Sequence, residues 1–311
     1  MEQTINLNDL IKSLCQQMKD ITIENGYLLW VNHIKAVVRE QTVLRYEKDF
    51  RQIRIFLEKK NIKMLSQVNN NVIDEFISFK RLTCKNVTIN QQIQVFGFMI
   101  HYLIKEKYIN FNPLENYKPL INERYQTKAQ SEDTIHKALN YIDQMDEKNL
   151  TSLRNKVILL LMYDTGLRNN EIANIKKTDL DLINNMIHLS YTKAHENRII
   201  MISDKTKKSL VNLITRLSSK TIFILNLQNP LRPLNTRVII RAYQELSHSI
   251  EAHINNRNTR TTFATNLVQN GADIKSVMDL MGHNNMRTTQ KYFDNEKSRV
   301  KRIHQELTLD K

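Results

Sequence analysis

Glycine and proline are scarce in this chain, with 5 Gly and 4 Pro among 311 residues. Tight turns depend on these two residues, because glycine reaches positive φ and proline fixes φ near −65°. The shortage therefore favours a mainly helical fold with few β-hairpins. The hydrophobic fraction of 41% is high enough to form buried cores and excludes a disordered chain.

Two of the four prolines, Pro113 and Pro119, fall in the stretch YINFNPLENYKPLINERYQ. Proline lacks an N–H donor and interrupts helical periodicity, so this stretch predicts a linker between two domains. A length of 311 residues also suits two domains of roughly 100–200 residues each. The expected boundaries are 1–35 for an N-terminal helical extension, 36–108 for a small helical domain, 109–125 for the linker, 126–297 for a larger second domain and 298–311 for a C-terminal tail.

Apolar residues recur every three or four positions along the first domain, as on one face of a helix. The clearest case runs from Tyr46 to Leu57, and further helices are expected at about 72–82 and 88–107.

The second domain combines helices with one hairpin signal. A buried helix is expected over 153–163, then a turn at Gly166 and a new helix from about Asn169. Two β-rich runs, 186–191 and 198–202, flank a polar turn. The predicted fold class is therefore mainly α, with a small β-sheet in the second domain.

Short helices and tight turns characterise the stretch RNTRTTFATNLVQNGADIKSVMDLMGHNNMRTTQKYFD. Asp273 can cap one of these helices and Gly282 can end it. Because the elements are brief, we expect Arg260, His283 and Tyr292 to lie in one neighbourhood.

The chain is basic, with 46 Lys and Arg against 32 Asp and Glu, a formal net charge of +14. Such a charge favours an anionic partner, nucleic acid or a membrane surface, although a lysine-rich surface that only aids solubility is the alternative. No apolar run approaches the roughly 18–20 residues that span a bilayer, and the first residues lack the pattern of a secretion signal. Cys15 and Cys84 form neither a disulfide framework nor a zinc site. We expect a soluble, cytoplasmic protein with no metal or cofactor.

Four sequence boxes in order resemble the tyrosine recombinases of the lambda-integrase type. The T-F-A-T, G-A-D-I, L-M-G-H and T-T-Q-x-Y segments follow the cadence of that family, with spacings of 283 − 260 = 23 and 292 − 283 = 9. DTGLRNNEI resembles its first arginine box, and Lys193 occupies its hairpin lysine position. The resemblance covers about residues 36–300. It implies a helical core-binding domain and an α/β catalytic domain that close as a clamp around double-stranded DNA.

The chemistry implied is strand cleavage without metal or ATP. A tyrosine hydroxyl can attack a phosphodiester and form a 3′-phosphotyrosyl bond that stores the energy for rejoining, a role for Tyr292. Arginine forks stabilise charge on the non-bridging oxygens, a role for Arg168 and Arg260.

Three further residues are expected to support this reaction. Lys193 would protonate the departing 5′ oxygen, unless it is one of several solvated lysines. His283 would hydrogen-bond the phosphate, unless it only satisfies the end of its helix. Glu171 would hold Arg168 in place, although acidic residues are common near helix starts.

One position departs from the family pattern. Three residues before the second arginine, where the family has histidine, this chain has Arg257. An arginine can contact phosphate but does not accept a proton, so Tyr292 loses its obvious general base. We expect an active but atypical enzyme, with Arg257 in the site.

The resemblance also implies a homotetramer on paired DNA sites. The C-terminal tail would dock on a neighbouring protomer, and the alternative is a helix packed on its own domain. An accessory DNA-bending or directionality factor and nucleoid association are further expectations. Alternatives are a topoisomerase of type IB, a telomere resolvase, or an inactive architectural DNA-binding protein. The biological task, among chromosome-dimer resolution, plasmid maintenance and movement of a mobile element, stays open at this point.

Overall fold

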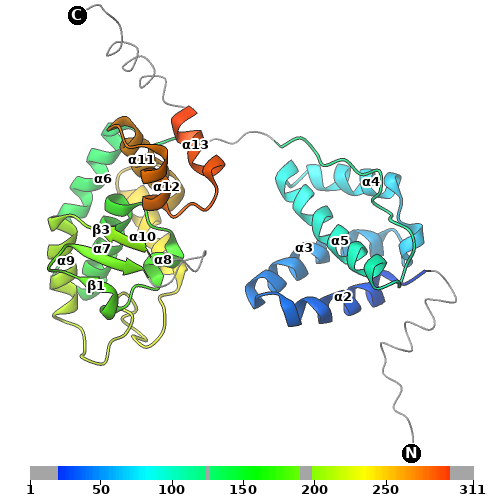
Figure 1. Ribbon diagram of the computed structural model, residues 1–311, viewed down its shortest axis with the longest axis horizontal. Helices are drawn as coiled ribbons and strands as arrows, with labels where there is room; N and C mark the ends of the chain where they lie inside the picture. Colours follow the sequence, from blue (N-terminus) through cyan, green and yellow to red (C-terminus); the bar gives the residue numbers. More distant parts are fainter. Residues whose placement is uncertain (1–19, 123–126, 190–197, 295–311) are drawn as a thin grey trace, which may run out of the picture. The chain divides into compact units, whose positions relative to one another are not determined.

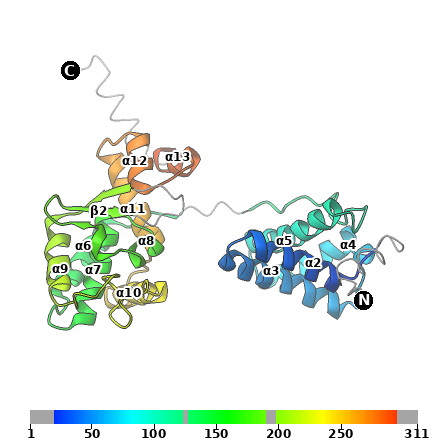
Figure 2. The same ribbon diagram turned by 60° about the horizontal axis from the view of Figure 1, so that its bottom comes forward.

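The computed structural model describes residues 20–122, 127–189 and 198–294 of the chain, which divides into two compact units, Met1–Tyr125 and Gln126–Lys311 (Figures 1 and 2). Helices dominate both units, and the sheet found in the described ranges is three-stranded and belongs to the second unit. The expected fold class is confirmed. No helix in the described ranges is long and apolar enough to cross a membrane.

The first unit is a helical bundle. Its elements are α2 (Ile23–Val37), α3 (Glu40–Lys59), a 3₁₀ turn (Leu65–Gln67), α4 (Asn70–Arg81) and α5 (Asn86–Lys105). Phe50, Phe76 and Phe96 are at most 1% exposed and form the centre of the core. Aromatic side chains of this size supply much of the burial that a small domain needs.

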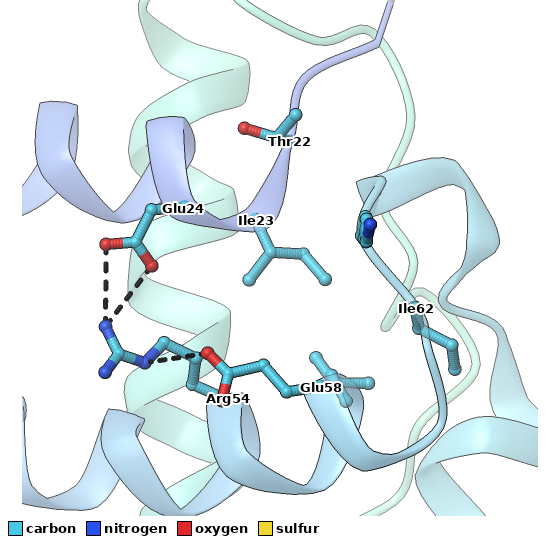
Figure 3. A pocket seen from close by; sticks show the side chains of 8 residues that line it. Thr22, Ile23, Glu24, Arg54, Glu58 and Ile62 are labelled. Atoms are coloured by element: carbon cyan, nitrogen blue, oxygen red, sulfur yellow. Dashed lines mark hydrogen bonds and ion pairs between the residues drawn. The ribbon is translucent and has the colours of Figure 1, made fainter.

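Helix α2 packs into this same core, although residues 1–35 were expected to form a separate extension. Tyr27 stacks on Phe50 of α3 with ring centroids 4.4 Å apart. Gly26 lets α2 approach α5 closely, since a Cβ there would lie 2.9 Å from Leu103 Cδ1. Figure 3 shows a pocket at the start of α2, where Arg54 of α3 pairs with Glu24 (3.2 Å). The shared apolar core therefore groups α2 with the helices that follow it.

The proline-containing segment after α5 also packs on the first unit up to residue 122. Ile109 is 4% exposed. The Asn90 side chain of α5 donates to Leu120 O (2.8 Å) and accepts from Leu120 N and the Tyr117 hydroxyl (2.9 Å each). Proline prevents helix here but not packing, so the segment expected to be a linker over 109–125 is anchored along most of its length.

The second unit surrounds the buried helix α7. Its first part contains α6 (Glu132–Gln144), α7 (Leu150–Thr165), α8 (Asn169–Ala173), β1 (Leu180–Asp181), β2 (Met186–Leu189), β3 (Arg198–Met201), α9 (Asp204–Ile214) and α10 (Thr236–Ser249). The strands form an antiparallel meander in the order β1-β2-β3, with Ile187 paired to Ile200 on the buried face. Strand β1 was not expected from the sequence, because two residues carry no periodicity.

Three helices complete the second unit: α11 (Asn256–Gln269), α12 (Ile274–Met281) and α13 (Met286–Asp294). They lie side by side at one end of the unit (Figures 1 and 2). Val268, Val277, Met281 and Tyr292 share a small core of their own. Asp273 caps α12 by accepting from two backbone N–H groups, as the sequence predicted.

The turn at Gly166 generates the first testable prediction. Gly166 has φ +60°, and a Cβ there would lie 2.6 Å from Phe263 Cδ1, whereas Gly271 has φ +88° with no atom within 4 Å of its Cβ position. We expect Gly166→Ala to lower the free energy of unfolding by about 3 kcal/mol, from left-handed strain plus overpacking. Gly271→Ala should cost only about 1 kcal/mol. Equal losses in denaturant unfolding would contradict this packing.

Candidate active site

The candidate site is built around the C-terminal end of α12. Helix α12 ends at Gly282, which has φ +59°. The last carbonyl groups of a helix have no partner within it and carry the negative end of the helix dipole. Here three consecutive carbonyls accept hydrogen bonds from three different arginines. The contacts are Arg198 Nη1 to Leu280 O (2.9 Å), Arg260 Nη2 to Met281 O, and Arg168 Nη2 to Gly282 O (2.8 Å).

A buried carboxylate connects two of these arginines. Glu171 is 3% exposed, and its Oε1 accepts from Arg168 Nη1 (2.9 Å). Its Oε2 accepts from the Arg168 backbone N–H (2.8 Å) and from Arg198 Nη2 (2.8 Å). Glu171 reaches these donors because it stands in the first turn of α8, three residues after the residue that caps the helix. Burial lowers the pKa of the Arg198 guanidinium, and the Glu171 carboxylate opposes that shift.

Gly282 is required by the arginines as well as by its backbone. A Cβ at this position would lie 2.8 Å from Arg198 Cζ and 3.3 Å from Arg168 Nη1. A residue with a side chain would displace both guanidinium groups. The glycine in the L-M-G-H segment therefore leaves space for the two guanidinium groups, in addition to permitting the left-handed turn.

Arg260 links this end of α12 to the end of α7. Its guanidinium donates to Gly166 O, at the C-terminus of α7, as well as to Met281 O. Burial lowers the pKa of Arg260 to about 10, and the charge of Arg168 adds to that shift. The group is still protonated at neutral pH, so it brings a full positive charge into a largely desolvated site.

His283 follows directly and is held on both sides of its ring. Its Nε2 lies 3.2 Å from Arg260 Nη2, and its Nδ1 lies 2.9 Å from Thr289 Oγ1. Burial, followed by the charge of Arg260, lowers the pKa of His283 to about 3. Because arginine can only donate, Nε2 is the acceptor and the proton of the neutral ring is on Nδ1.

Tyr292 lies on α13 against His283. The two rings are nearly parallel, at 13°, with centroids 6.4 Å apart, and Tyr292 is 7% exposed. Burial raises the pKa of the Tyr292 hydroxyl, and the charge of Arg260 and a hydrogen bond with Thr261 act in the opposite direction. Tyr292 is therefore a neutral phenol at neutral pH that must lose a proton if it is to attack phosphorus.

The structure brings together five of the residues expected from the sequence: Arg168, Glu171, Arg260, His283 and Tyr292. Arg257, in the exposed first turn of α11, is close enough for its charge to act on the Tyr292 hydroxyl. Lys193 lies outside the described residues. Within the described ranges, no group of three His, Cys, Asp or Glu side chains could hold a metal ion.

Arg198 was not expected from the sequence. It begins the apolar run RIIMIS of β3, where an arginine is ordinarily assigned to solvent. Its side chain is instead only 12% exposed and pairs with Glu171. The sequence feature that could have indicated a buried ion pair was a cation at the first position of an otherwise apolar strand.

Comparison with known proteins decides the family. Residues 128–299, more than half of the chain, match the phage integrase family. The chain belongs to the phage integrase family. This match includes the whole of the candidate site described above, from Arg168 to Tyr292.

Curated relatives extend the likeness over nearly the full length. The tyrosine recombinase XerD of Staphylococcus haemolyticus is 24% identical over 298 residues, covering 92% of this chain and 98% of the relative. The tyrosine recombinase XerC of Syntrophus aciditrophicus is 27% identical over 267 residues, covering 79% and 84%. As a phage integrase family member with such relatives, the protein is a tyrosine site-specific recombinase.

Solved structures of two family members share the fold. The Tn1549 transposon integrase in complex with transposon right end DNA has a TM-score of 0.70 at 19% identity, covering 91% of this chain and all (100%) of that one. A lambda integrase dimer bound to a COC′ core site has a TM-score of 0.72 at 12% identity, covering 92% and 81%.

The pairing of Arg198 with Glu171 gives a stability prediction for this integrase fold. Arg198→Met keeps an apolar stem but removes one of two cations from a carboxylate that is 3% exposed. We expect the free energy of unfolding to fall by about 3 kcal/mol, since breaking a buried pair leaves a charge without its partner. Denaturant unfolding measures the loss.

The matched control is Lys205→Met, which breaks a pair with Asp143 whose two side chains are 46% and 50% exposed. Such exposed pairs contribute about 0–1 kcal/mol. Equally small losses in the two variants would show that the Glu171 contacts do not stabilise the site.

The low pKa of His283 predicts a pH dependence. The folded ring has a pKa of about 3, against about 6.5 in the unfolded chain. The unfolded state therefore binds more protons as pH falls from about 6.5 towards 3, and this histidine destabilises the fold progressively over that range. His283→Gln should reduce the loss of unfolding free energy between pH 7 and pH 4. An NMR titration that shows the His283 ring charging near pH 6.5 would contradict the prediction.

Proposed function

We propose that this recombinase cleaves DNA with Tyr292 as its nucleophile and forms a 3′-phosphotyrosyl intermediate. The observation that supports the proposal is the position of the tyrosine. It lies beside His283 and close to the charge of Arg260, next to the end of α12 where three guanidinium groups converge. A phosphate diester is the anion that such an arrangement would bind.

The reaction has a simple balance. The Tyr292 oxygen bonds to phosphorus as its proton passes to a neighbouring base, and the bond from phosphorus to the 5′ oxygen breaks. Arg168 and Arg260 stabilise the charge on the non-bridging oxygens, and His283, with its ring proton moved to Nε2, hydrogen-bonds one of them. Lys193 donates the proton that the 5′ oxygen needs. Attack by another 5′-hydroxyl on the phosphotyrosyl bond reverses these changes and joins the strand.

Two helices offer basic faces for double-stranded DNA. Exposed side chains at helical spacing follow one face of α3 and one face of α10. These are Arg45, Lys48, Arg51 and Lys59 on α3, and Arg237, Arg241, Gln244 and His248 on α10. Contacts of arginine and lysine with phosphates would supply salt-dependent affinity, and helices in the major groove would read sequence. The first unit would then act as the core-binding domain and the second as the catalytic domain of a clamp.

Strand exchange requires more than one protomer. We propose a homotetramer on two paired DNA sites. The tail over 298–311, outside the described residues, would dock on a neighbouring protomer. A DNA-bending or directionality factor would assist, and the complex would act on the nucleoid in the cytoplasm. Integration, excision and dimer resolution use the same strand exchange, and the DNA site decides among them.

The competing proposal is an architectural DNA-binding protein that has lost catalysis. Arg257 is the observation that favours it, because arginine supplies no proton acceptor. The assembled contacts of Arg168, Arg260 and His283 favour an active enzyme. A topoisomerase of type IB and a telomere resolvase would share the cleavage step and differ in the topology of the product.

The test is to express the protein with its native flanking DNA, denature it rapidly and sequence any DNA that remains covalently attached. We expect a discrete adduct that Tyr292→Phe abolishes, because the variant keeps the buried ring and loses the nucleophile. Tyr141→Phe, on α6, is the matched control and should leave the adduct intact. Specific binding without an adduct, even on nicked substrates that trap cleavage, would support the architectural protein instead.

A further inference from the structure

The described groups that act on the Tyr292 hydroxyl, which are Thr261 and three arginines, include no strong proton acceptor. Burial raises its pKa, so the proton must be taken up as the oxygen attacks phosphorus. The charged groups acting on it most strongly are Arg260, Arg257 and Arg168. Guanidinium groups stabilise an oxyanion but do not accept a proton.

His283 is neutral but poorly suited to this task. Its pKa of about 3, set by burial and then by Arg260, makes it a very weak base. Its Nε2 faces Arg260 and its Nδ1 faces Thr289. Both ring nitrogens are therefore engaged, and neither is free to remove a proton from the phenol.

Lys291 stands next to the tyrosine on α13. Its Nζ lies over the Tyr292 ring, 5.0 Å from the ring centroid. A lysine side chain has several rotatable bonds and a compact amine. To act as a base, the amine has to move from the ring face to hydrogen-bond distance of the hydroxyl, or act through one water.

The charges around Lys291 come from the two helices that pack on α13. Helix α11 contributes Arg257 and Arg260, which act directly on the amine. Helix α12 carries Lys275 and Asp279, both exposed, and α13 itself carries the exposed Arg287. Lys291 is itself exposed. Partial burial of its amine, followed by the charges of Arg257 and then Arg260, lowers the pKa of Lys291.

We propose that Lys291 is the general base that accepts the Tyr292 proton, directly or through one water. The proposal rests on Tyr292 being the nucleophile, as argued above. The O–H bond of Tyr292 breaks as its oxygen bonds to phosphorus, the proton passes to the neutral amine, and the 5′ oxygen departs. The ammonium so formed stays over the electron-rich ring face, a favourable cation–π position.

Arg257 then has a defined part in the reaction. It does not accept a proton, but its charge lowers the pKa of the neighbouring amine, which can. Lys291 would act as the base, and Arg257 would activate it.

The experiment uses Lys291→Arg, which keeps the positive charge and removes the ability to accept a proton. Cleavage of a nicked trapping substrate is followed in single turnover, with protein saturating the DNA, from pH 6 to pH 10. The wild-type rate should rise with pH, because a larger fraction of the Lys291 amine can then accept a proton. Lys291→Arg should cleave about 10²–10⁴-fold more slowly near neutral pH and lose this rise, because general-base catalysis contributes about that much.

Two further variants make the result specific. Lys275→Arg, on the exposed face of α12, is the matched control and should cleave at the wild-type rate. Arg257→His introduced into Lys291→Arg supplies a new acceptor beside the tyrosine and should restore at least tenfold of the lost rate.

An unchanged rate and pH profile in Lys291→Arg would overturn the proposal, since Lys291 would then act only as a cation. A slow variant that Arg257→His does not rescue would also overturn it, by pointing to altered positioning. Wild-type protein that forms no Tyr292 adduct would instead remove the proposed function, and the base with it. The three results are distinguishable in one set of reactions.

Discussion

The rest of the site depends on one contact at the end of α12. There, three adjacent carbonyl groups each accept a hydrogen bond from a different arginine. The arginines come from β3, from the residue that caps α8 and from α11. This contact joins segments that are 82 and 114 residues apart in the sequence. A helix C-terminus attracts cations, and the shortness of α12 and its turn fixes where they gather.

The same contact prepares the site for an anion. Three guanidinium groups and one carboxylate, Glu171, leave a local charge of 3 − 1 = +2. Each guanidinium has five N–H donors, so an arginine that holds a carbonyl group retains donors for a phosphate. Because the protein dipoles are already in place, little reorganisation would be needed if charge developed on a bound phosphorus. Tyr292 packs against His283 beside them, so folding places the proposed nucleophile and the charge together.

Local signals in the sequence were sufficient for much of this site. Gly166 and Gly282 marked helix ends, Asp273 marked a helix start, and the spacing from Arg260 to Tyr292 placed three candidate residues in one neighbourhood. Arg198 could not be found in this way, because its partners are 27 and 82 residues distant and strand patterning assigns an arginine to solvent. The packing of residues 109–122 on α5 could not be predicted either. Proline indicates that a segment is not helical, but it does not indicate whether the segment is buried.

The central claim is that Tyr292 and the arginines around α12 act on one phosphate. The most direct measurement is a structure of the protein on its DNA site with vanadate bridging the nicked strand, since vanadate adopts the five-coordinate geometry of the transition state. We expect vanadium bonded to the Tyr292 oxygen, with Arg168 and Arg260 donating to its equatorial oxygens. Vanadate or scissile phosphate bound away from Tyr292, with these arginines still engaged only with the protein, would contradict it.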